Sequence, residues 1–521
     1  MERRDAAMSL SVLPFLADRP AGDQNIYQAI GVEPIINCRG TFTIIGGSVE
    51  RPEVLAAMEA ASGYFVQYDE LAAAIGQRLA DITGAEWGLI SAGCAAGMKH
   101  VTIACVTGGN PEKLIRVPDL TGLDRTQVIM PRYSRNAYDH AVRNAGVEIV
   151  TVATPEELEQ AINPRTAMIY LTTGRASDRG QPLSLEVMAE LAGERDIPIL
   201  ADAAAEDLAI PDVHLARGAT VVAYSGGKAL CGPQCAGLVL GRKDILMSAW
   251  QASSPHHGPG RDDKIGKEEM VGMLAAVEAW TTRDHAGEWR TWLSRLESIS
   301  KRVAEIPSVT TQVDEPTGLS NRAPALTISW DPAALHITGE EVAEDFARNK
   351  PRIAVGSGDE EGRACIRITP SQMQPGNDAV VADRVHGILS EPRSPRSAEL
   401  RPADVNLSGL WDLTVEFPSS TSRHRLSISQ DGNWIEGSHE SDLSVQEIFG
   451  VVEGDQVKLR SEVRRPGDYI PFMFSGKVSG DTFSGSIHLG EYLTATFTAK
   501  RSSHRSPRRP IAIPGGPPLA T

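Results

Sequence analysis

Near its middle the chain carries the stretch Tyr224-Ser225-Gly226-Gly227-Lys228-Ala229-Leu230-Cys231-Gly232-Pro233-Gln234. It follows the apolar run 219–223, which is typical of a buried strand. An earlier apolar run, 199–201, ends at Asp202. The sequence therefore predicts a lysine and an acid at the ends of two neighbouring strands.

Such a pair meets the needs of a pyridoxal 5′-phosphate (PLP) site. The lysine forms a Schiff base with the cofactor's aldehyde, and the acid keeps the pyridine nitrogen protonated. Taken singly, Lys228 reads as a solvated loop lysine and Asp202 as a helix N-cap. The small residues around Lys228 favour the functional interpretation, because they let a flat ligand approach the backbone.

A third element, Ser91-Ala92-Gly93-Cys94-Ala95-Ala96-Gly97, joins an expected strand to an expected helix. Small residues at such a turn leave backbone N–H groups open to a phosphate. Small residues also occur at such turns for packing, so the motif gains weight only together with Lys228. The Ser225 hydroxyl is a further candidate ligand of the phosphate.

Composition excludes several classes of function. The chain has 521 residues and a formal net charge of −16, which argues against a nucleic-acid partner. Its six cysteines show no paired metal-ligand spacing, so we expect no metal site and read them as reduced thiols of a cytoplasmic protein. No apolar run approaches the length that spans a bilayer.

Residues 26–305 alternate short apolar runs with amphipathic stretches, which predicts an α/β domain with a mostly parallel sheet covered on both faces. Residues 306–390 read as a smaller α+β domain. We expect a flexible arm at 1–25, a linker at 391–404 and a disordered tail at 502–521.

Residues 405–501 carry short alternating runs separated by turn residues, which predicts an all-β domain of about eight strands. A barrel is favoured because closure removes exposed strand edges. Five of its residues are candidates to line a small cavity, or alternatively to pack in the core or at the rim: Trp411, Trp434, His439, Glu491 and Tyr492.

The stretches 224–237 and 201–206 resemble fold-type I PLP enzymes of the selenocysteine-synthase-like group, and within it the D-glucosaminate-6-phosphate ammonia-lyase branch. The motifs at 31–41 and 260–269 support the resemblance, which covers about residues 27–389. It implies a large domain with a seven-stranded sheet and a homodimer with active sites at the subunit interface.

The resemblance also assigns roles to individual residues. Lys228 would form the Schiff base and Asp202 would pair with the ring nitrogen. The phosphate would be held by Gly93, Cys94, Ala95 and Ser225, and the substrate would face Thr41, Ser48 and Arg261.

Two further site residues are assigned their roles less directly. Relatives place a histidine in the 131–136 region, where this chain offers Tyr133 to stack on the cofactor. Arg367 lies in an expected strand of the small domain, where fold-type I enzymes often bind a substrate carboxylate with an arginine. A surface strand arginine is the alternative.

The sequence thus predicts a PLP-dependent lyase that carries out α,β-elimination on an amino acid or amino-sugar acid, giving a 2-keto acid and ammonia. Selenium or sulfur transfer to seryl-tRNA uses the same lysine motif. However, the chain is acidic, and only about 25 residues precede the core where a tRNA-binding domain is expected. Transamination, racemisation and aldol cleavage also remain open, as does a non-catalytic scaffold that binds through the barrel.

Overall fold

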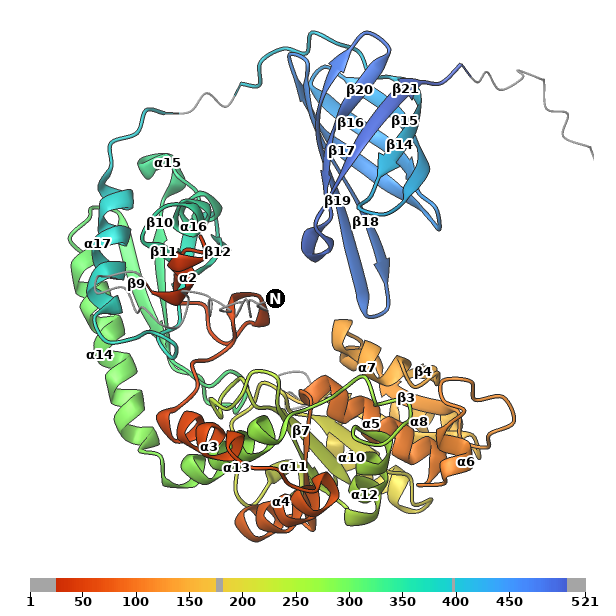
Figure 1. The fold of residues 1–521 in the computed structure, drawn as a ribbon. Helices are drawn as coiled ribbons and strands as arrows, with labels where there is room; N and C mark the ends of the chain where they lie inside the picture. The colour runs from red at the N-terminus through yellow and green to blue at the C-terminus, as the bar shows by residue number, and fades with distance from the viewer. Residues whose placement is uncertain (1–24, 175–180, 396–398, 504–521) are drawn as a thin grey trace, which may run out of the picture. The chain divides into compact units, whose positions relative to one another are not determined.

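The computed structural model describes residues 25–174, 181–395 and 399–503. The chain forms two compact units, residues 1–395 and 396–521 (Figure 1). The expected arm lies outside the described residues except for its last position, and the expected tail lies outside them from residue 504 onward. No helix among the described residues is long and apolar enough to cross a membrane.

The first unit contains a seven-stranded sheet in the order β2-β8-β7-β6-β5-β3-β4. The bounds are β2 Trp87–Ser91, β3 Gln127–Pro131, β4 Glu148–Val152, β5 Thr166–Thr172, β6 Ile199–Asp202, β7 Val221–Ser225 and β8 Gly237–Gly241. Only β8 runs antiparallel to its neighbours, so the expected mostly parallel sheet is confirmed. Parallel strands end at one edge, and β8 begins there.

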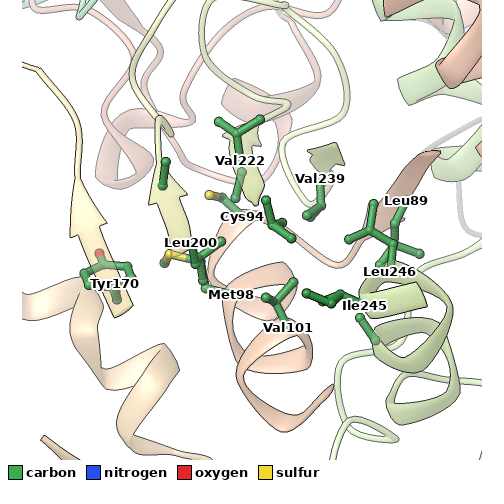
Figure 2. Close-up of a cluster of buried hydrophobic side chains, with 14 of the residues drawn as sticks. Leu89, Cys94, Met98, Val101, Tyr170, Leu200, Val222, Val239, Ile245 and Leu246 are labelled. Carbon is green, nitrogen blue, oxygen red and sulfur yellow. The ribbon is translucent and has the colours of Figure 1, made fainter. Parts of the chain in front are cut away.

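Helix α5 (Cys94–Thr107) covers one face of this sheet and packs against β2, β5, β6, β7 and β8. Figure 2 shows Cys94, Met98 and Val101 of α5 among side chains of the strands. Nearly every residue of α5 is buried, which explains why its sequence lacks an amphipathic pattern.

The other helices of this domain connect or flank the strands. Their bounds are α2 Ile26–Ala29, α3 Pro52–Ser62, α4 Tyr68–Thr83, α6 Pro111–Leu114, α7 His140–Arg143, α8 Pro155–Ala161, α10 Leu185–Gly193, α11 Val213–Ala216, α12 Lys243–Ala252 and α13 Lys267–Thr282. Helix α13 ends at Thr282 and is followed by a second long helix. Asp284 lies between the two and caps α14 (His285–Val303) by accepting a hydrogen bond from the Gly287 N–H at 2.8 Å.

The small α+β domain has its own buried core and a four-stranded sheet in the order β12-β13-β10-β9. The bounds are β9 Val309–Asp314, β10 Ala325–Trp330, β12 Gly356–Glu360, β13 Arg363–Ile368, α15 Pro332–Leu335, α16 Gly339–Arg348 and α17 Asn377–Ser390. Strand β1 (Ile35–Asn37) pairs in parallel with β11 (Arg352–Ala354), which fixes the N-terminal segment to this domain.

The second unit is a closed barrel of eight antiparallel strands, as expected. The bounds are β14 Gly409–Glu416, β15 Thr421–Asp431, β16 Trp434–Glu440, β17 Val445–Glu453, β18 Gln456–Arg465, β19 Asp468–Ser479, β20 Thr482–His488 and β21 Thr494–Arg501. Buried and exposed residues alternate along them, as a filled barrel requires.

The five barrel candidates follow the alternative interpretation, packing in the core or lying exposed at the surface, and do not line one cavity. Trp411 and His439 are fully buried among phenylalanines, whereas Trp434 and Tyr492 are 65% and 49% exposed, and Glu491 is also exposed. Residues that point to opposite sides of the wall cannot line one cavity.

The barrel interior holds a hydrogen-bonded pair of histidines. His424 Nδ1 lies 2.9 Å from His439 Nε2, and His439 Nδ1 lies 2.7 Å from Ser461 Oγ. Burial lowers the pKa of His439 to about 3, with a further contribution from His424. Burial also lowers the pKa of His424. Both rings are therefore held neutral inside the barrel.

The barrel should consequently lose stability in mild acid. The unfolded chain binds a proton at His439 near pH 6.5, whereas the folded barrel binds it only near pH 3, so stability falls as the pH drops below 6.5. Between pH 7 and pH 5 we expect His439 alone to cost about 2 kcal/mol. Hydrogen exchange of peptides from 405–501 in the full chain measures this loss.

The matched variants are His439→Gln, which removes the buried imidazole, and His488→Gln, which removes an exposed imidazole of the same barrel. His439→Gln should reduce the pH dependence of the barrel's stability, and His488→Gln should leave it unchanged. An unchanged pH dependence in His439→Gln would contradict the assignment.

Candidate active site

Lys228 follows β7 at the edge where the parallel strands end. It is half-buried, and its Nζ makes no hydrogen bond or ion pair with the described residues. The nearest ring is that of Tyr138, whose centroid lies 6.0 Å from Nζ. A partly buried amine without a hydrogen-bonding partner is available for covalent chemistry.

Asp202 is the last residue of β6, the strand beside β7, and is only 5% exposed. Its Oδ1 accepts a hydrogen bond from the Ala204 N–H at 3.1 Å, and its Oδ2 accepts one from the Tyr170 hydroxyl at 2.9 Å. Burial raises the pKa of Asp202 above its ordinary value, while these donors and the charge of Lys228 lower it. The structure thus brings the predicted lysine and acid together.

The third predicted element forms the N-terminus of α5. Gly93 is its N-cap in a left-handed conformation (φ 88°), without a capping side chain, and Ala95 in the first turn is exposed. The first-turn N–H groups of a helix have no partners within it, so they are open to an anion. The Ser225 hydroxyl at the end of β7 makes no side-chain hydrogen bond with the described residues.

These features fit PLP. Lys228 supplies the free amine, and Asp202 a buried carboxylate that favours a protonated ring nitrogen. The N-terminus of α5 is an uncapped anion site at the same edge of the sheet. Gly237 at the start of β8 permits this arrangement, because a Cβ there would collide with Gly93 and with the nitrogen of Cys94.

Tyr133 and Tyr138 differ in their surroundings. Tyr133 is half-buried and packs against the core, its hydroxyl donates to the Leu183 carbonyl at 2.7 Å, and burial raises its pKa to about 12. Tyr138 is 64% exposed and lies beside Lys228. Sequence reasoning missed Tyr138, although it is an aromatic residue a few positions beyond the region considered.

The loop from Thr41 to Ser48 reaches the lysine loop through one side chain. Gln234 packs against both Gly47 and Gly227, since a Cβ on either glycine would collide with its amide. Thr41 and Ser48 are half-buried, and Ser48 Oγ is enclosed without a hydrogen-bond partner among the described residues. Gln234 ends the stretch 224–234 that contains Lys228, but nothing in the sequence indicates its contact with the distant Gly47.

Arg261 lies in an exposed turn, and its guanidinium makes no hydrogen bond or ion pair with the described residues. The residues after it hold the turn in place. Lys99 of α5, with its side chain 10% exposed, pairs with Asp262 at 3.0 Å and with Asp263 at 2.8 Å. The turn is therefore fixed to the same helix whose N-terminus forms the anion site.

Arg367 is not brought to this group by any described contact. It lies on an exposed position of β13, where its Nη1 pairs with Asp314 at 3.1 Å and donates to Thr327 at 3.2 Å. The arrangement matches the alternative interpretation, a surface strand arginine. Its role toward a substrate stays a prediction.

Comparison with known proteins finds no matching family model. The chain is 32% identical over 303 residues to D-glucosaminate-6-phosphate ammonia lyase of Salmonella typhimurium, covering 56% of this chain and 78% of that protein. It is 28% identical over 386 residues to 5′-C-glycyluridine monooxygenase-decarboxylase of a Streptomyces species, covering 72% of this chain and 94% of that protein.

A solved structure of D-glucosaminate-6-phosphate ammonia-lyase superposes with a TM-score of 0.63 at 27% identity, covering 70% of this chain and 98% of that one. The fold thus agrees with the sequence relationship. The chain belongs to the D-glucosaminate-6-phosphate ammonia-lyase family of fold-type I, PLP-dependent enzymes in the selenocysteine-synthase-like group.

Proposed function

We propose that this enzyme is a carbon–nitrogen lyase that eliminates the elements of water from a β-hydroxy amino acid or amino-sugar acid and releases a 2-keto acid and ammonia. The observation that carries the proposal is the Lys228 amine, which has no hydrogen-bond partner among the described residues, near the buried Asp202 carboxylate. The relationship to an ammonia lyase that is named for an amino-sugar acid supports it.

When bound, PLP supplies an aldehyde that links to amines and a ring that accepts electrons from the substrate's Cα. Lys228 Nζ would give up its own link to the substrate amine and then remove the Cα proton as general base. The Cβ–O bond breaks, and Lys228 returns that proton to the departing hydroxyl as water. The ionised Asp202 carboxylate would favour a protonated ring nitrogen.

The product side needs no further catalyst. Lys228 would take back its own link and so release the product nitrogen as an enamine, which tautomerises to an imine and is hydrolysed to the 2-keto acid and ammonia. Thr41, Ser48 and Arg261 remain the proposed substrate-facing residues. The exposed guanidinium of Arg261 suits an anionic substrate group, because it has no intramolecular ion pair among the described residues. Gly93, Cys94, Ala95 and Ser225 remain the proposed phosphate ligands.

For the ring-stacking position we retain Tyr133 and add Tyr138 on the strength of its place beside Lys228. Either aromatic ring offers a flat face to the cofactor. We also propose that the enzyme works in the cytoplasm, which the free state of all six cysteines supports.

We propose in addition that the enzyme is a homodimer. Twelve of the twenty-six large apolar side chains that are exposed in the described part of the chain lie within residues 26–66. Phe65 is 100% exposed and Ile44 is 81% exposed. Many exposed apolar side chains within one segment are a feature that a subunit interface would bury.

Replacing Lys228 with Ala should abolish the visible absorbance band that borohydride fixes to the protein, because the amine that forms the link is lost. Elimination should fall by about a factor of a thousand or more. Lys264→Ala, at an exposed lysine, serves as the control and should keep both properties. A normal cofactor spectrum in Lys228→Ala would refute the assignment.

The purified enzyme should release 2-keto acid and ammonia in equal amounts from one or more 2-amino-3-hydroxy acids. A screen of D- and L-hydroxy amino acids and amino-sugar acids, phosphorylated and unphosphorylated, measures both products. Keto acid formed only when a second keto acid is supplied would indicate transamination instead. Consumption of oxygen with release of carbon dioxide would indicate an oxidative decarboxylation.

Phe65→Glu should convert the dimer to a monomer, because a charge buried in an apolar interface is not compensated. Analytical ultracentrifugation measures the mass directly. Phe449→Glu places the same change at a 55% exposed barrel position and should leave the mass unchanged. A wild-type monomer would contradict the proposal.

A further inference from the structure

The Asp202 carboxylate is enclosed by donors from three elements. Tyr170, on β5, is fully buried and donates its hydroxyl to Oδ2 at 2.9 Å. Cys94, the first residue of α5, directs its thiol at Oδ1 from 3.9 Å. The Ala204 N–H donates to the same oxygen at 3.1 Å. Figure 2 shows Tyr170 and Cys94 in the layer between the sheet and α5.

Three titratable groups therefore face Asp202: Tyr170 from β5, Cys94 from α5 and Lys228 from the loop after β7. Burial raises the pKa of both the Tyr170 phenol and the Cys94 thiol well above their ordinary values, and the charge of Asp202 adds to this. Both remain neutral donors at any working pH. Each acts against the burial that raises the pKa of Asp202.

We propose that Tyr170 is a positioning residue whose hydroxyl keeps the Asp202 carboxylate ionised and oriented toward the cofactor's ring nitrogen. The proposal rests on the proposed use of PLP at this site. Without this donor, the described residues would leave Asp202 the backbone N–H and the distant thiol as its hydrogen-bond donors. A buried carboxylate with fewer donors binds a proton more readily, and a neutral carboxyl no longer favours a protonated ring.

The hydroxyl rather than the ring carries this role. The Tyr170 ring fills the core beside α5, and a phenylalanine would fill the same volume. The chain provides a matched comparison on the strand next to Asp202. Tyr224 of β7 is also buried and donates to a different carboxylate, Asp212 Oδ2, at 2.6 Å.

The test is the pH dependence of PLP binding to the apo protein, followed by absorbance between pH 6 and pH 9. In Tyr170→Phe we expect the acid side of the binding profile to move about one unit to higher pH, because the carboxylate loses one hydrogen bond. Affinity should fall roughly tenfold at the acid end and recover in alkali. Tyr224→Phe should follow the wild-type profile.

The Asp202→Asn variant tests whether Tyr170 acts through the Asp202 carboxylate. Because this variant has no carboxylate at position 202, adding Tyr170→Phe to it should change the profile no further. A Tyr170→Phe profile that superimposes on the wild type would overturn the inference, and so would an equal shift in Tyr224→Phe. Failure of the wild-type protein to bind PLP would instead refute the proposed function.

If the Tyr170→Phe protein does not fold, a substitution that keeps the packing tests the same role. Incorporating 3-fluorotyrosine at position 170 preserves the size of the ring and makes the hydroxyl a stronger donor. The acid side of the profile should then move to lower pH. An unchanged profile in the fluorinated protein would also contradict the role of Tyr170.

Discussion

The close approach of β8 to the N-terminus of α5 is the constraint on which the active site depends. Gly237 permits it, because any side chain there would collide with Gly93 and the nitrogen of Cys94. Gly93 in turn adopts a left-handed conformation that favours glycine. Together they open the first turn of α5 at the edge where β6 and β7 deliver Asp202 and Lys228. The anion site, the acid and the amine therefore share one edge of the sheet.

Much of the fold could be predicted from the sequence, since most strands of the large sheet are continuous apolar runs and several barrel strands alternate between buried and exposed residues. Strand β8 (Gly237–Gly241) escaped prediction because it begins and ends with glycine, as turns often do. The break between α13 and α14 was not predicted although the sequence marks it, because Asp284 is a typical N-cap and Thr281, Thr282 and Gly287 near it are weak helix formers.

Site residues could be predicted where the sequence around them is unusual. Lys228 and Asp202 follow apolar strands, and a small-residue turn precedes α5. Tyr170 has no such mark, because a tyrosine within a β-strand reads as ordinary core until its hydroxyl is found against Asp202. Contacts between distant segments, such as those of Lys99 with Asp262 and Asp263, depend on the tertiary fold and leave no local pattern.

The position of Gln234 between Gly47 and Gly227 has a consequence for how this enzyme can change its substrate. The loop that is proposed to face the substrate and the loop that carries the lysine share the space of a single amide side chain. A loop grafted from a relative would fit only if it also brought a glycine at position 47, or if Gln234 were reduced in size at the same time. Substrate range and the lysine loop are therefore expected to diversify together rather than separately.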